Sequence, residues 1–212
     1  MPKPKADGRL AVLVALCLLG GAAFAQARPD ALMLYREARY EEARAACMAE
    51  LEADPDNIES YVVLTWSLVA LGRYADAELY ATRAYERVRR DPRIVEILGE
   101  AAYYQGKNEE ALAHFQSYVN LLPDGSRMGA VYYFMGEIYI RKERWGHADI
   151  ALRTALQYEP RNVRWWARMG YARERGAEHA HALAAYDEAL KIDPSFADAR
   201  QGRERMLSRL RN

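Results

Sequence analysis

The four histidines are the first side chains to consider for acid–base or metal chemistry: His114, His147, His179 and His181. His179 and His181 are two positions apart, and side chains with this spacing on a helix point in different directions. No third ligand stands at a spacing typical of a metal site, so we predict no metal and no cofactor. Serine-nucleophile, phosphate-loop, dinucleotide-binding and zinc-protease motifs are also absent from the sequence. The sequence therefore predicts a protein that is not an enzyme.

The densest charged group consists of four arginines, Arg87, Arg89, Arg90 and Arg93. These side chains could bind a phosphate or an acidic partner, but such a run is more often a solvated face near a helix C-terminus. Lysine plus arginine and aspartate plus glutamate both number 30, so no overall field attracts nucleic acid. We therefore expect no nucleic-acid partner. Cys47 stands at a position that suits a buried apolar side chain, and we favour this reading over a reactive thiol.

Residues 129–162 contain the clearest structural pattern. Their apolar and aromatic positions fall on one side of each of two helical stretches. Gly136 and Ala148 are small, which lets the two helices cross closely, and Pro160 ends the second helix because it has no N–H to donate. The positions that define the pattern are Tyr132, Met135, Gly136, Tyr139, Ala148, Leu152, Ala155 and Pro160. This pattern resembles the tetratricopeptide repeat at nearly every defining position.

The small residue at the predicted helix crossing recurs along the chain as Ala43, Ala77, Ala111, Ala148 and Ala182. Three of the four intervals match the period of the tetratricopeptide repeat, about 34 residues, and the interval between Ala111 and Ala148 is slightly longer. The resemblance implies an all-α fold, a right-handed superhelical solenoid of antiparallel helix pairs. We expect about five units within 29–196, followed by a capping helix over 197–212. The units are 28–57 (degenerate), 58–91, 92–125, 129–162 and 163–196.

Several positions depart from the repeat pattern. Thr65 replaces the small glycine in the second unit, and Gly176 lies one residue early for the turn of the fifth unit. Three extra residues follow the third unit. Since three residues are close to one helical turn, we predict a longer first helix in the fourth unit, starting at Ser126. Ser195 and Asp198 have the spacing of a capping box for the last helix.

Residues 1–25 do not follow the repeat and are typical of a secretory signal peptide. A charged start is followed by an apolar run from Leu10 to Leu19 and by Ala23-Phe24-Ala25 at the expected cleavage site. The run of ten is short for a bilayer-spanning helix, which needs ~20 residues. We expect a periplasmic or secreted protein. The alternative is an uncleaved inner-membrane anchor with the repeats facing the periplasm, and this segment would then be the only contact with a membrane.

The resemblance also implies where a partner binds, because the first helices of such units line a concave groove. The side chains expected there are Glu59, Val62, Trp66, Glu96, Glu100, Tyr103, Tyr133, Glu137, Ile140, Arg164, Ala167, Tyr171 and Glu174. Aromatic side chains with acids between them suit an extended protein or peptide segment of apolar and basic character. The lysine and asparagine residues with which some family members clamp a carboxylate terminus are absent. We therefore expect a non-enzymatic interaction scaffold of the bacterial cell envelope.

Three alternatives stay open at this point. The groove could carry a small apolar ligand against Trp66, Tyr103 and Tyr133. The tyrosines could instead pack between units without binding anything. A degenerate first unit could also leave an apolar edge exposed and lead to self-association.

Overall fold

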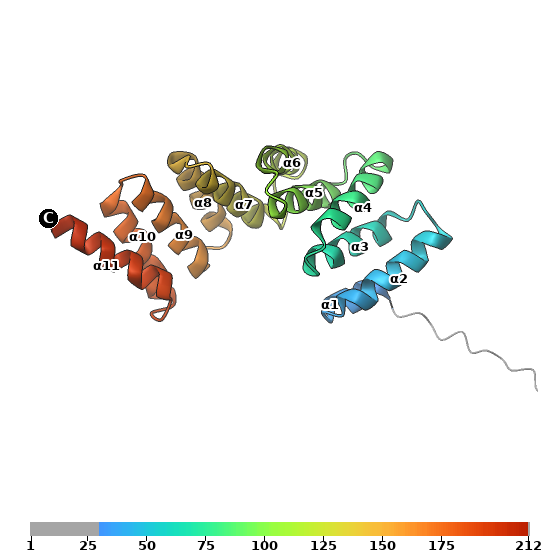
Figure 1. Cartoon of the computed structure of the whole chain (residues 1–212), viewed down its shortest axis with the longest axis horizontal. Coiled ribbons are helices and arrows are strands. Elements are labelled where there is room, and N and C mark those ends of the chain that lie inside the picture. The colour runs from blue at the N-terminus through green and yellow to red at the C-terminus, as the bar shows by residue number, and fades with distance from the viewer. Residues whose placement is uncertain (1–29, 212) are drawn as a thin grey trace, which may run out of the picture.

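The structure is a computed structural model that describes residues 30–211. The expected signal segment lies outside the described residues. Within them the chain forms eleven α-helices and no strand (Figure 1). The helices are α1 (Ala31–Arg36), α2 (Tyr40–Ala53), α3 (Ile58–Ala70), α4 (Tyr74–Arg87), α5 (Pro92–Tyr104), α6 (Asn108–Leu121), α7 (Met128–Arg141), α8 (Trp145–Tyr158), α9 (Val163–Arg175), α10 (His179–Ile192) and α11 (Ala197–Arg211). None of these helices is long and apolar enough to cross a membrane.

Each helix packs on the next one in sequence, and α1 to α10 form five consecutive pairs. The first helices of neighbouring pairs also touch, as α1 does with α3, α3 with α5, and α5 with α7. Figure 1 shows the pairs arranged along the long axis, from α1 and α2 at one end to α11 at the other. The predicted all-α solenoid is thus confirmed.

The helix crossings explain the recurring alanines. Ala43, Ala77, Ala111, Ala148 and Ala182 are all completely buried. Across three of these crossings, a glycine of the first helix faces a bulky side chain sixteen residues later. A Cβ added at Gly99 would lie 2.6 Å from Cε1 of Phe115, and one added at Gly136 would lie 2.7 Å from Cγ of Leu152. The glycines are therefore required by close packing rather than by backbone conformation.

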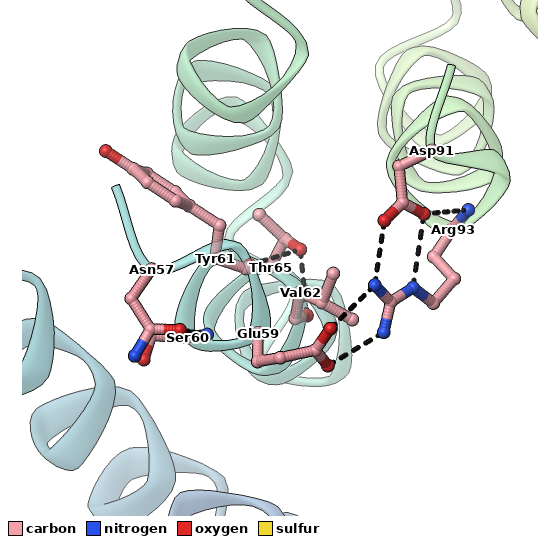
Figure 2. A network of polar contacts seen from close by, with 8 residues as sticks. All are labelled: Asn57, Glu59, Ser60, Tyr61, Val62, Thr65, Asp91 and Arg93. Atoms are coloured by element: carbon pink, nitrogen blue, oxygen red, sulfur yellow. Dashed lines mark hydrogen bonds and ion pairs between the residues drawn. The ribbon is translucent and has the colours of Figure 1, made fainter. Parts of the chain in front are cut away.

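The second unit achieves the same packing with the sizes exchanged. Thr65 stands at the glycine position, Ala81 stands at the position of the bulky side chain sixteen residues later, and both are completely buried. The Thr65 hydroxyl donates to the carbonyl oxygens of Tyr61 and Val62 at 2.8 and 2.9 Å (Figure 2). A buried hydroxyl without a partner would be unfavourable, so these bonds make threonine acceptable at this crossing.

A left-handed residue recurs between the two helices of every pair. These residues are Ala38, Gly72, Gly106, Glu143 and Ala177, with φ between 55° and 76°. They follow the same intervals as the crossing alanines. Glycine adopts this conformation without steric cost, whereas alanine and glutamate are strained there. In the fifth unit the strained residue is Ala177, because Gly176 has φ −77° and only ends α9.

Two sequence-based predictions about helix starts are wrong. The first helix of the fourth unit begins at Met128 and not at Ser126, because the extra residues extend the turn after α6. There the amide of Gly125 donates to Leu122, and that of Met128 donates to Gly125. The predicted capping box is also not formed, since the Ser195 hydroxyl donates to Asp193 at 2.6 Å and α11 begins only at Ala197.

Candidate functional site

The residues predicted for the groove divide into two sets by burial. Six remain accessible on the first helices: Glu59, Trp66, Tyr133, Glu137, Arg164 and Tyr171. The other seven are buried: Val62, Glu96, Glu100, Tyr103, Ile140, Ala167 and Glu174. Side chains such as Val62, with 1% of its surface exposed, belong to the core and offer a partner almost no contact area.

The groove glutamates are paired with arginines of the following unit. Arg93 holds Glu59 and its own helix cap Asp91, with the guanidinium between the two carboxylates in Figure 2. Arg168 binds Glu137 at 2.6 Å. The remaining groove acids follow the same rule: Glu96 and Glu100 pair with Arg127, and Glu174 pairs with Arg205. Most of these arginines follow their glutamate at close to one repeat period. This recurring spacing is the signal in the sequence that points to the ion pairs.

Arg127 differs from the other arginines of this series because its guanidinium contacts two buried glutamates and not one. Glu96 and Glu100 are 3% and 8% exposed. Burial first, and then the negative charge of Glu96, raise the pKa of Glu100 to about 8. Arg127 acts against this rise but does not cancel it. Glu100 therefore keeps a proton near neutral pH, and its side chain shares the Arg127 guanidinium with Glu96.

A pocket of about 390 Å³ opens beside this group. We call it the Trp66 pocket, and its lining is Tyr35, Trp66, Pro92, Arg93, Glu96, Tyr118, Leu122, Ser126 and Arg127. The rings of Tyr35 and Trp66 lie 5.6 Å apart between centroids and form one wall. Its volume suits a large side chain or a small ligand. Sequence reasoning placed Trp66 and Glu96 in the groove but missed Tyr35, which belongs to the unit considered degenerate.

Toward the other end, arginines lie over aromatic rings. We call the side chains of Arg141, Arg164, Arg168 and Arg175 the arginine surface. The guanidinium of Arg141 lies 3.9 Å from the ring centre of Tyr103, that of Arg168 lies 5.0 Å from Tyr171, and that of Arg175 lies 5.0 Å from Trp145. Such cation–π contacts hold the guanidinium in place.

Tyr133 links this surface to the core. Its ring stacks on Trp165 with centroids 5.3 Å apart. Burial, and then the charge of Glu137, raise the pKa of Tyr133 to about 12, while Arg168 and Arg164 oppose the rise. Tyr133 and Glu137 of α7 and Arg164 and Arg168 of α9 therefore lie close enough to influence one another electrostatically.

The sequence profile of the tetratricopeptide repeat matches residues 64–126 and 135–195. This is more than half of the chain. The chain belongs to the tetratricopeptide repeat family. Proteins of this family generally mediate protein–protein interactions, and their repeat scaffold is typically non-enzymatic.

Among curated proteins, the chain is 25% identical over 151 residues to the general transcriptional corepressor ssn6 of Schizosaccharomyces pombe, covering 67% of this chain and 14% of that protein. It is 23% identical over 154 residues to the peroxisomal targeting signal receptor of Kluyveromyces lactis, covering 71% of this chain and 26% of that receptor. The chain thus spans about a quarter or less of these relatives.

Solved structures show the same fold at low sequence identity. The APC/C hetero-tetramer Cut9-Hcn1 matches with a TM-score of 0.74 and 20% identity, covering 84% of this chain and 35% of that chain. MamA matches with a TM-score of 0.67 and 20% identity, covering 79% and 90%. YrrB, described as a TPR protein with an unusual peptide-binding site, matches with 0.68 and 17% identity, covering 79% and 84%.

The other chemical candidates have structural roles in this tetratricopeptide protein. Cys47 is completely buried, and burial raises the pKa of its thiol to about 12, which leaves it unreactive at neutral pH. Arg87 pairs with Asp56, and Arg93 pairs with Glu59 and Asp91, whereas Arg89 and Arg90 are exposed. No group of three potential metal ligands exists among residues 30–211.

Proposed function

We propose that this tetratricopeptide protein is an interaction scaffold that holds an extended segment of a partner protein along its first helices. The observation that carries the proposal is that Trp66, Tyr133 and Tyr171 stay accessible on the first helices α3, α7 and α9. Aromatic side chains provide a large contact area at low cost in conformational entropy. The peptide-binding description of YrrB and the receptor role of the Kluyveromyces relative support the same assignment.

The apolar character expected of the partner agrees with the accessible aromatic side chains. The expected basic character is less well supported. That expectation rested on the groove glutamates, and their carboxylates are already paired with arginines of the chain. A basic partner would have to displace these arginines. We therefore propose an apolar segment as the minimal description of the partner.

We further propose that the scaffold works in the bacterial cell envelope. The support is the signal-like start, with its charged residues, its apolar run and Ala23-Phe24-Ala25. N-terminal sequencing of the protein from fractionated cells tests this. A mature chain that begins at Gln26 in the periplasmic or secreted fraction is expected, and a cytoplasmic chain that begins at Met1 would contradict the proposal.

Crosslinking pull-downs test the groove itself. The variant Trp66→Ala with Tyr133→Ala is compared with wild type and with Leu79→Ala plus Ile150→Ala, which alters two exposed side chains on second helices, 48% and 64% exposed. The groove variant is expected to lose its partner while the control keeps it. Unchanged capture by a folded groove variant would remove the groove from the account.

The Trp66 pocket favours one second candidate, a carrier of a small apolar ligand. Tyr35, Trp66 and Leu122 supply an apolar lining of suitable size. Native mass spectrometry of the gently purified protein separates the two functions. A stoichiometric small molecule that is lost from Trp66→Ala would favour the carrier, whereas an empty protein that captures a partner favours the scaffold.

A further inference from the structure

The charges of the groove differ between its two ends. Around the Trp66 pocket the carboxylates of Glu59, Asp91 and Glu96 outnumber the guanidiniums of Arg93 and Arg127. Along the face of α7, α9 and α11 that carries Tyr133 and Tyr171 the balance reverses, because five arginines lie among three acids. These arginines are Arg141, Arg164, Arg168, Arg175 and Arg205, and the acids are Glu137, Glu174 and Asp198.

Burial strengthens the difference at the arginine-rich end. The side chains of Glu137 and Glu174 are 12% and 7% exposed, whereas those of their partners Arg168 and Arg205 are 31% and 47% exposed. The carboxylates thus lie beneath the guanidiniums. A molecule that approaches this end meets positive groups first.

Three arginines of this end also lack a carboxylate partner within residues 30–211. They are Arg141, Arg164 and Arg175, which form none of the ion pairs in that range. Arg141 and Arg175 are held by aromatic rings. Their side chains are therefore partly ordered before a partner binds, and binding loses less conformational entropy. Guanidinium groups presented in this way suit two parallel hydrogen bonds to a carboxylate.

We propose that the partner segment is acidic where it crosses α7 and α9 and places an apolar side chain in the Trp66 pocket. This proposal rests on the proposed function and adds the charge order of the partner. A protein segment fits better than nucleic acid, because the chain carries 30 basic and 30 acidic residues and the positive groups are confined to one end of the groove. Binding weakens as ionic strength rises.

Selection from a random dodecapeptide library displayed on phage tests the proposal. The wild-type protein is expected to enrich peptides that contain aspartate and glutamate together with a large apolar residue. A selected peptide is then titrated against Arg164→Glu plus Arg175→Glu and against the neutral pair Arg164→Gln plus Arg175→Gln. The matched control, Arg83→Glu plus Lys191→Glu, makes the same charge change on the second helices α4 and α10.

The acidic peptide should bind wild type and the control equally and the glutamate variant at least about tenfold more weakly, with the glutamine variant between them. Enrichment of lysine and arginine, with binding abolished by Trp66→Ala plus Tyr133→Ala, would overturn the acidic partner and keep the groove. Peptides that bind this aromatic variant as well as wild type, or no enrichment at all, would overturn both the groove and its charge order.

Discussion

Arg127 follows Glu96 at nearly one repeat period in the sequence, yet Nη2 of the arginine lies 2.9 Å from Oε1 of the glutamate. The arginine comes from the turn that the three extra residues extend between α6 and α7. The irregular interval in the repeat therefore supplies the counter-ion of two buried carboxylates. It also supplies part of the lining of the Trp66 pocket.

Removing this arginine should destabilise the protein. Arg127→Ala leaves Glu96 and Glu100 buried without a counter-ion. We expect this to lower the unfolding free energy by roughly 1–3 kcal/mol, and most at pH 8 and above, where Glu100 loses its proton. Urea unfolding measures the loss. Arg203→Ala is the control, because the Arg203–Asp187 pair is exposed on both sides and should contribute less than about 1 kcal/mol. Equal losses in the two variants would mean that the contacts of Arg127 with Glu96 and Glu100 stabilise the fold no more than an exposed ion pair does.

Glu100 should make stability decline with rising pH. Its pKa is about 8 in the folded protein against 4.5 ordinarily, so between these values the folded state keeps a proton that the unfolded state has released. Glu96, Arg127, Tyr104 and Tyr35 are the charged or titratable groups around it. The unfolding free energy of Glu100→Gln minus that of wild type should therefore increase from pH 4.5 to 8.

The comparison for Glu100→Gln is Glu109→Gln. The exposed Glu109 has its pKa lowered by its hydrogen bond to Lys142, so its small stabilising contribution is constant above pH 4.5 and is lost only as the pH falls below that value. The difference curve for Glu109→Gln should therefore be flat above pH 4.5 and change only at more acidic pH. Thermal or urea unfolding across the pH range gives both difference curves. A flat curve for Glu100→Gln between pH 4.5 and 8 would show that Glu100 is ionised like an ordinary carboxylate.

The strained turn of the fifth unit offers a stabilising substitution. Ala177 has φ 62°, so Ala177→Gly should raise the unfolding free energy by about 0.5–1 kcal/mol. The same change at Ala184, an exposed residue inside α10, should lower it by about 1 kcal/mol. If the unfolding free energy rises for Ala177→Gly and falls for Ala184→Gly, the difference comes from the backbone conformation at the two sites. A lower unfolding free energy in both variants would contradict strain at Ala177.

The second and third units place the larger and the smaller residue on opposite helices of the crossing. We therefore predict that substitutions at Gly99 and Phe115 have non-additive effects on the unfolding free energy. Gly99→Thr alone should cost about 1–3 kcal/mol through overpacking against Phe115, and Phe115→Ala alone about 3–5 kcal/mol through a cavity. The double variant reproduces the Thr65 and Ala81 arrangement and should cost clearly less than the two single changes added together. Strict additivity in calorimetric unfolding would indicate that the two positions do not share one space.

The sequence was sufficient for the architecture because small residues at a fixed period report helix crossings directly. Ala43 and Ala182 could be assigned to equivalent places without coordinates. The start of α7 could not, since Ser126 and Arg127 have no counterparts in the other units and helix length alone favoured an earlier start. The observed turn is fixed by contacts with distant residues such as Glu96.

The candidate site was only partly accessible to sequence reasoning. The repeat register placed Trp66 and Tyr133 on the first helices, as found. It did not reveal that the glutamates on the same face are occupied, because the paired arginines come from the next unit and register alone does not show which side chains meet. Tyr35 was missed since the pattern of the first unit is incomplete.

Site-specific photocrosslinking in cells tests most directly the claim that the first helices hold the partner. A photoreactive phenylalanine analogue replaces Tyr133 or Tyr171 in the groove, or Leu79 or Ile150 on the second helices. We expect the two groove positions to give the same discrete protein adduct on irradiation and the two second-helix positions to give none. Adducts only from Leu79 and Ile150 would contradict it and assign binding to the opposite face.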